Sequence, residues 1–189
     1  MVIAFSGPRP HKIVEEHDDE DTIIDFYDET RPYPSKIKEW LSSFLADLLP
    51  KCPPDSKLKI ITGGALGVDT WAAEAAQELT QVDHLLAVPF RVFHKRWPVK
   101  DQVRYLKIKS KATDYHEVGT GWSRYIYDER NKYMIDNCDL LVAVYSNTGG
   151  GTESAITYAA RIDKPTLSWC YKTDTLVVPE EFKYLFKDG

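Results

Sequence analysis

The chain has 189 residues, of which 43% are hydrophobic and 28% are charged, a balance typical of one globular α/β domain with a sizeable core. The formal net charge of −5 argues against a nucleic-acid partner, and no apolar run approaches the length of a membrane span. Three scattered cysteines lack metal-ligand spacing, so we expect a reduced, cytoplasmic compartment, no metal site and no bound cofactor.

The first predicted strand covers residues 2–5, and a basic, proline-containing loop follows it. Gly7 allows a tight turn at the carboxyl end of this strand, directly after Ser6. Arg9, His11 and Lys12 could each contact an anion there, or could simply belong to an exposed loop.

A strongly acidic run occupies residues 15–29, within an insertion that we place at about 13–34. Such runs are usually solvated loops, although Ile24 and Phe26 could anchor a lid over a neighbouring site. A helix is predicted from about Pro34, with Ser35 as its N-cap, and its apolar stripe places Trp40 in the core.

A glycine-rich turn follows the second predicted strand, residues 58–61, and precedes a helix over about 68–79. Gly63, Gly64 and Gly67 could bring backbone N–H groups close to a phosphate or sugar at the helix start. Asp69 could accept hydrogen bonds from ribose hydroxyls, or could merely favour the positive end of the helix.

A third strand is predicted at residues 84–88, followed by a segment in which aromatic and basic residues alternate. Phe90 in this segment could stack on a base, with packing at the edge of the domain as the alternative. A helix over 99–112 and a strand over 115–118 come next.

The last third of the chain predicts a helix over 128–137, a buried strand over 140–145 and a second glycine turn. Arg130 and Asn131 lie in the first half of that helix. The turn contains Gly149, Gly150, Gly151 and Thr152 and opens another helix, which makes it a candidate phosphate-binding loop. A strand over 165–169 precedes a tail, counted from about residue 170, which we expect to wrap the surface.

Alternating strands and helices predict a Rossmann-like, three-layer α/β/α domain over residues 1–189, with a mainly parallel sheet. In such sheets ligands bind beyond the carboxyl ends of the strands, where the strand order reverses. Both glycine turns and the first basic loop lie at that edge, so we expect them to form one binding site.

Several motifs together resemble the SLOG superfamily, which includes the DprA/Smf proteins and the lonely-guy phosphoribohydrolases. They are Ser-Gly-x-Arg-Pro at 6–10, Thr-Gly-Gly-Ala-Leu-Gly-Val-Asp at 62–69, Val-Pro-Phe at 88–90, Arg-Asn-x-x-Met at 130–134 and Gly-Gly-Thr at 150–152. The chain is most similar to the YpsA-like branch. The resemblance implies a pocket for a nucleotide or nucleotide-derived ligand, such as a nucleoside phosphate, a dinucleotide or an ADP-ribose-like molecule, and pairing of copies into a homo-oligomer.

In the phosphoribohydrolases an Arg and a Glu act at the N-glycosidic bond, and the resemblance carries the arginine over to Arg130. The family's glutamate position is Ser154 here, and Glu153 lies one residue earlier. On a helix this offset rotates the side chain by about 100°. We therefore expect a ligand-binding sensor or regulator, with an N-glycosidase that uses Arg130 and Glu153 as the alternative. DprA-like binding of single-stranded DNA is the third hypothesis, and the negative charge argues against it.

Overall fold

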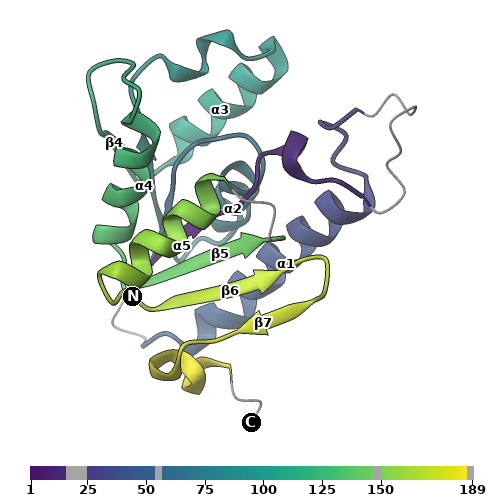
Figure 1. Ribbon diagram of the computed structural model, residues 1–189, viewed down its shortest axis with the longest axis vertical. Coiled ribbons are helices and arrows are strands. Elements are labelled where there is room, and N and C mark those ends of the chain that lie inside the picture. Colours follow the sequence, from purple (N-terminus) through teal and green to yellow (C-terminus); the bar gives the residue numbers. More distant parts are fainter. Residues whose placement is uncertain (16–24, 54–56, 147–149, 187–189) are drawn as a thin grey trace.

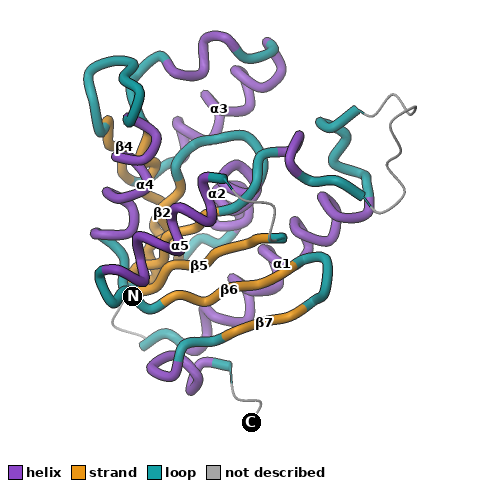
Figure 2. Tube along the Cα trace, viewed as in Figure 1, coloured by secondary structure: helices purple, strands orange, loops and turns teal. Residues whose placement is uncertain are grey.

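The computed structural model describes residues 1–15, 25–53, 57–146 and 150–186, and its centre is a seven-stranded sheet (Figures 1 and 2). The strand order is β4-β3-β2-β1-β5-β6-β7. The strands are β1 (Val2–Ser6), β2 (Leu58–Thr62), β3 (Val82–Val88), β4 (Asp114–Glu117), β5 (Leu140–Tyr145), β6 (Thr166–Cys170) and β7 (Thr175–Val177). The pairs from β4 through β6 are parallel, and β7 runs antiparallel to β6.

Helices cover both faces of this sheet, which confirms the predicted Rossmann-like three-layer fold. The α-helices are α1 (Pro32–Leu48), α2 (Val68–Glu78), α3 (Val99–Lys111), α4 (Ile126–Asp136) and α5 (Gly151–Arg161). Short 3-10 helices are η1 (Pro10–Lys12), η2 (Leu49–Lys51), η3 (Phe93–Arg96) and η4 (Glu180–Leu185). Figure 1 shows α5 on one side of β5 and β6, with α1 on the other.

Successive side chains of the central strand β1 point to opposite faces of the sheet, so each face packs against its own layer of helices. Ile3 and Phe5 in β1 pack into the core with α1 and α2, whereas Ala4 belongs to the opposite core with α4 and α5. Small residues, Ala155 and Ala159, form the buried side of α5. Helix α3 packs with α2 and β3 through Tyr105 and Ile108, on the same face of the sheet as α1.

The sheet reverses its strand order at β1. The chain proceeds outward from β1 through β2 and β3 to β4, and then returns to place β5 on the other side of β1. The carboxyl ends of β1 and β5 therefore flank a topological switch point, where open α/β sheets form a crevice.

Two sequence expectations need correction. The first long helix begins at Pro32, so Ser35 is inside it, and its hydroxyl donates to Glu39 Oε1 rather than capping the helix. Proline suits the first helical position because its missing N–H has no partner there in any case. The tail also adds strand β7 to the sheet edge, which its short pattern did not reveal.

Within the described ranges, the structure contains no helix that is both long and apolar enough to cross a membrane. Most of the acidic run, residues 16–24 with Ile24, lies outside the described residues, and so does Gly149.

Candidate functional site

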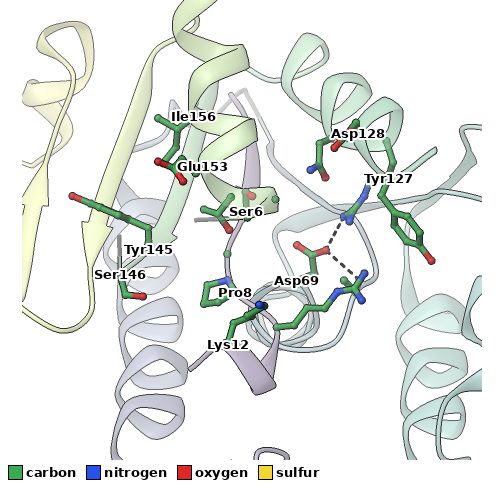
Figure 3. Close-up of a pocket in the computed structure, with 18 of the residues that line it drawn as sticks. Ser6, Pro8, Lys12, Asp69, Tyr127, Asp128, Tyr145, Ser146, Glu153 and Ile156 are labelled. Atoms are coloured by element: carbon green, nitrogen blue, oxygen red, sulfur yellow. Dashed lines mark hydrogen bonds and ion pairs between the residues drawn. The ribbon is translucent and has the colours of Figure 1, made fainter. Parts of the chain in front are cut away.

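A cavity of about 550 Å³ opens at the carboxyl ends of β1 and β5, at the switch point of the sheet. We call it the switch-point cavity. Figure 3 shows Glu153 and Ile156 of α5 on one side, Tyr127 and Asp128 of α4 on the other, and Ser6 and Asp69 between them. The lining includes these predicted site residues: Ser6, Gly7, Arg9, Asp69, Arg130, Asn131, Gly150, Gly151, Thr152 and Glu153.

Close packing between the loop after β1 and the start of α2 forms the floor. A Cβ on Gly7 would stand 2.5 Å from Val68 Cβ, and one on Gly67 would stand 2.5 Å from the Pro8 carbonyl oxygen. Gly67 also has a φ of +91°, which favours glycine. The two glycines therefore let the first loop lie directly against the first turn of α2.

Three basic side chains of the first loop reach the cavity: Arg9, His11 and Lys12. The Arg9 guanidinium carbon lies 5.5 Å from the centre of the Tyr127 ring, an arrangement that keeps it beside α4. Burial, with the charges of Arg9 and Lys12, lowers the pKa of His11. The positive charge of this wall therefore comes mainly from Arg9 and Lys12.

Arg130 is a buried cation in this site, with only 6% of its surface exposed. Its Nη1 donates to Asp69 Oδ2 at 2.7 Å, and the same carboxylate oxygen accepts from the Ala65 backbone N–H at 3.1 Å. Its Nε is buried and has no hydrogen-bond partner among the residues that the structure describes. Buried polar atoms are usually paired, so this unpaired N–H is an exception within the site.

Asp69 thus orients Arg130 in the structure. We predicted that Asp69 accepts bonds from ribose hydroxyls; with Oδ2 already shared between two donors, its contact with a ligand stays a prediction. The guanidinium also accounts for Gly63, because a Cβ there would stand 1.1 Å from Arg130 Nη1.

The first turn of α5 forms the opposite wall. Gly150 is its N-cap and has a φ of +106°, while Gly151 and Thr152 begin the helix. Unpaired N–H groups at a helix start attract anions. Glu153 lies in the same turn and also lines the cavity, where it adds a carboxylate.

Four predicted binding residues do not line the cavity: Gly63, Gly64, Gly67 and Phe90. Gly64 has a φ of +70°, and a Cβ on it would meet Val88 and Leu86, so it serves the packing of the turn. Phe90 is buried against Phe93, with ring centres 6.2 Å apart. Gly149, also predicted, lies outside the described residues.

Tyr127 and Asp128 are among the lining residues that sequence reasoning missed. Both precede Asn131 by three or four positions, so the helical repeat places them on its side of α4. Within the described ranges, no group of three or more His, Cys, Asp or Glu side chains could hold a metal ion.

A family model described as the YspA SLOG family matches residues 21–177. The uncharacterised SPbeta prophage-derived protein YoqJ of Bacillus subtilis is 28% identical over 142 residues, covering 67% of this chain and 81% of that protein. A UPF0398 protein of Lactobacillus acidophilus is 32% identical over 92 residues, which cover 46% of this chain and 49% of that protein.

Two solved DNA processing proteins A (DprA) share the fold. The Streptococcus pneumoniae protein gives a TM-score of 0.58 at 12% identity, covering 89% of this chain and 50% of that one. The Helicobacter pylori protein gives a TM-score of 0.58 at 17% identity, covering 98% of this chain and 71% of that one. The chain thus spans half the length of the first DprA.

The DprA likeness corrects one expectation. We argued from the net charge of −5 against a nucleic-acid partner. The Helicobacter pylori DprA structure is described as giving insight into how that protein binds single-stranded DNA. That argument was wrong because net charge sums over the whole surface, whereas a nucleic-acid strand contacts only a local set of cations.

Proposed function

The chain belongs to the YspA SLOG family, and on this premise we propose that it binds a nucleotide through a phosphate group in the switch-point cavity. The observation that carries the proposal is the buried Arg130, which lines the cavity and is held by Asp69 at 2.7 Å. In this role the protein acts as a sensor or regulator that responds to the bound nucleotide.

The phosphate would lie between the first turn of α5 and the first loop. Backbone N–H groups at Gly151 and Thr152 donate from one side, and Arg9 and Lys12 supply positive charge from the other. Arg9 is preferred for direct pairing because its guanidinium can contact two phosphate oxygens at once. Arg130 would contribute positive charge from deeper in the cavity.

The sugar and base would extend toward α4. Tyr127 offers a half-buried aromatic ring there, and the Asp128 and Asn131 side chains offer acceptors for hydroxyl groups. A volume of about 550 Å³ falls in the usual range for small-molecule sites, and it accommodates a mononucleotide.

Calorimetry and thermal denaturation of the whole chain in the presence of ligands test the proposal. Isothermal titration calorimetry with AMP, ADP-ribose and a thymidine oligonucleotide measures binding to the whole chain. We expect Arg9→Ala to weaken phosphate-dependent binding by about tenfold or more. The matched control, Arg96→Ala, changes an exposed arginine on η3 outside this cavity, so its affinity should match wild type. Absence of heat and of thermal stabilisation with every probe would refute the proposal.

Cleavage of the N-glycosidic bond is a second candidate, because the Glu153 carboxylate lines the same cavity as Arg130. Such a reaction needs a carboxylate that stabilises an oxocarbenium-like transition state or activates water. Chromatography of AMP incubated with the protein would detect free adenine if this reaction occurs, and Glu153→Gln should then abolish its release. A protein that binds AMP and leaves it intact favours the sensor.

A further inference from the structure

A second cavity adjoins the first. It has a volume of about 440 Å³ and lies between α4 and α5, where Lys132, Ile135, Tyr158 and Arg161 help to line it. We call it the α4/α5 groove. Four residues line both cavities: Asp128, Asn131, Gly150 and Glu153. The groove therefore continues directly from the proposed nucleotide site.

Two cations project into this groove. Lys132 Nζ lies 5.6 Å and the Arg161 guanidinium carbon 5.3 Å from the centre of the Tyr158 ring. The Tyr158 hydroxyl donates to Asp136 Oδ1 at 2.8 Å, which fixes the ring between α4 and α5. Among the residues that the structure describes, neither Lys132 nor Arg161 forms an ion pair with a carboxylate. Both remain available to an anion.

The residues that line both cavities are acidic rather than basic at two positions. Asp128 and Glu153 place carboxylates there, which repel a phosphate but accept hydrogen bonds from sugar hydroxyls. The order of groups along the two cavities is thus cations, carboxylates, cations. This order matches a phosphate, a ribose and a second phosphate.

We propose, building on the proposed function, that the ligand is a 5′-phosphorylated dinucleotide unit that occupies both cavities. Its 5′-phosphate lies in the switch-point cavity, its first ribose lies between Asp128 and Glu153, and its internucleotide phosphate pairs with Lys132 and Arg161. Tyr158 is a positioning residue, because it holds both cations over the groove.

Calorimetry with AMP and with the 5′-phosphorylated dinucleotide pApA tests this proposal on the whole chain. We expect wild type to bind pApA about tenfold more tightly than AMP, because of the added contacts with the second phosphate. The double variant Lys132→Ala/Arg161→Ala should lose that advantage and keep its affinity for AMP. The matched control Lys57→Ala/Arg96→Ala, which removes two exposed cations outside both cavities, should behave as wild type.

The outcomes separate this proposal from the one on which it rests. Equal affinity of wild type for AMP and pApA overturns the dinucleotide proposal and leaves the phosphate site intact. An equal loss of AMP and pApA binding in the groove variant also overturns it, because the cations would then act on the first site. Failure of both ligands to bind refutes the proposed function itself.

Discussion

Gly63 lies against Arg130 in the structure, although the two residues are 67 positions apart in the sequence. A Cβ on Gly63 would stand 1.1 Å from Arg130 Nη1 and 2.2 Å from its Cζ. These atoms belong to the buried guanidinium that pairs with Asp69, and this guanidinium has little room to move. The absence of a side chain at position 63 therefore sets the position of the arginine.

We predict that Gly63→Ala displaces Arg130 and breaks its 2.7 Å bond to Asp69. Loss of a buried ion pair should lower the free energy of unfolding by roughly 2–4 kcal/mol. AMP affinity should fall at least about tenfold, since the guanidinium leaves the cavity wall. Urea denaturation and calorimetry measure the two effects.

The matched control is Gly121→Ala, because a Cβ on Gly121 meets nothing within 4 Å. That variant should unfold and bind as wild type does. Wild-type stability and affinity in Gly63→Ala would contradict the assigned position of Arg130.

The candidate site was only partly predictable at this scale. The Gly-Gly pair at 63–64 reads in the sequence as a phosphate-binding turn, yet Gly63 makes room for an arginine and Gly64 has a φ of +70°. Local sequence indicates where glycine is needed, whereas the distant residue that requires it depends on the tertiary fold. Arg9, Arg130 and Gly150 reach the cavity because strand ends and helix starts share one edge of the sheet.

At the scale of elements, Glu29 ties the end of the acidic run to three helices. Its carboxylate pairs with Arg104 of α3, accepts from Trp71 Nε1 of α2 at 2.8 Å and pairs with Lys38 of α1 at 3.0 Å. Burial by itself raises the pKa of Glu29, but the bonds from Arg104 and Trp71 lower it to about 2. Composition predicts a solvated loop, and it cannot show that one of many carboxylates meets partners on other elements.

Glu29→Gln should therefore lower the free energy of unfolding by about 1–3 kcal/mol, because an amide replaces a carboxylate that accepts charge-assisted bonds. Thermal and urea denaturation at pH 7 provide the measurement. Glu180→Gln is the control, because the Glu180 side chain is 82% exposed and pairs with Lys183, which is itself exposed. A stability change no larger in Glu29→Gln than in the control would show that the contacts of Glu29 do not stabilise the fold.

At the scale of the whole molecule, the order of elements predicted the architecture well. Alternating apolar strands and helices require crossover connections, and these place parallel strands in one sheet with helices on both faces. Strand β7 was missed because its exposed Thr175, Leu176 and Val177 carry no pattern of burial. It pairs with β6 through backbone bonds, which depend little on side-chain identity.

His84 lies inside this architecture, where it connects β2, β3 and α2. Its Nε2 is 2.9 Å from Thr62 Oγ1 and its Nδ1 is 2.9 Å from Gln77 Nε2. The side chain is only 1% exposed, and burial lowers its pKa from 6.5 to about 4. The folded protein thus keeps His84 neutral under conditions in which the unfolded chain would protonate it.

We predict that stability declines between about pH 6.5 and pH 4 because of this histidine. In that window the unfolded state binds a proton that the folded state does not, so the free energy of unfolding falls as pH falls. The full effect of the shift is on the order of 3 kcal/mol, since one pKa unit corresponds to about 1.4 kcal/mol. Below about pH 4.5 protonation of Glu29 lowers stability further, until pH reaches about 2.

Urea denaturation at several pH values tests the assignment with two variants. His84→Gln removes the titrating group and should flatten the decline between pH 6.5 and 4. His11→Gln changes an exposed histidine and should retain most of this decline, because the buried His84 is still present in that variant. An unchanged decline in His84→Gln would show that other groups cause the loss of stability at acid pH, and that the histidine between β2 and α2 contributes nothing to it.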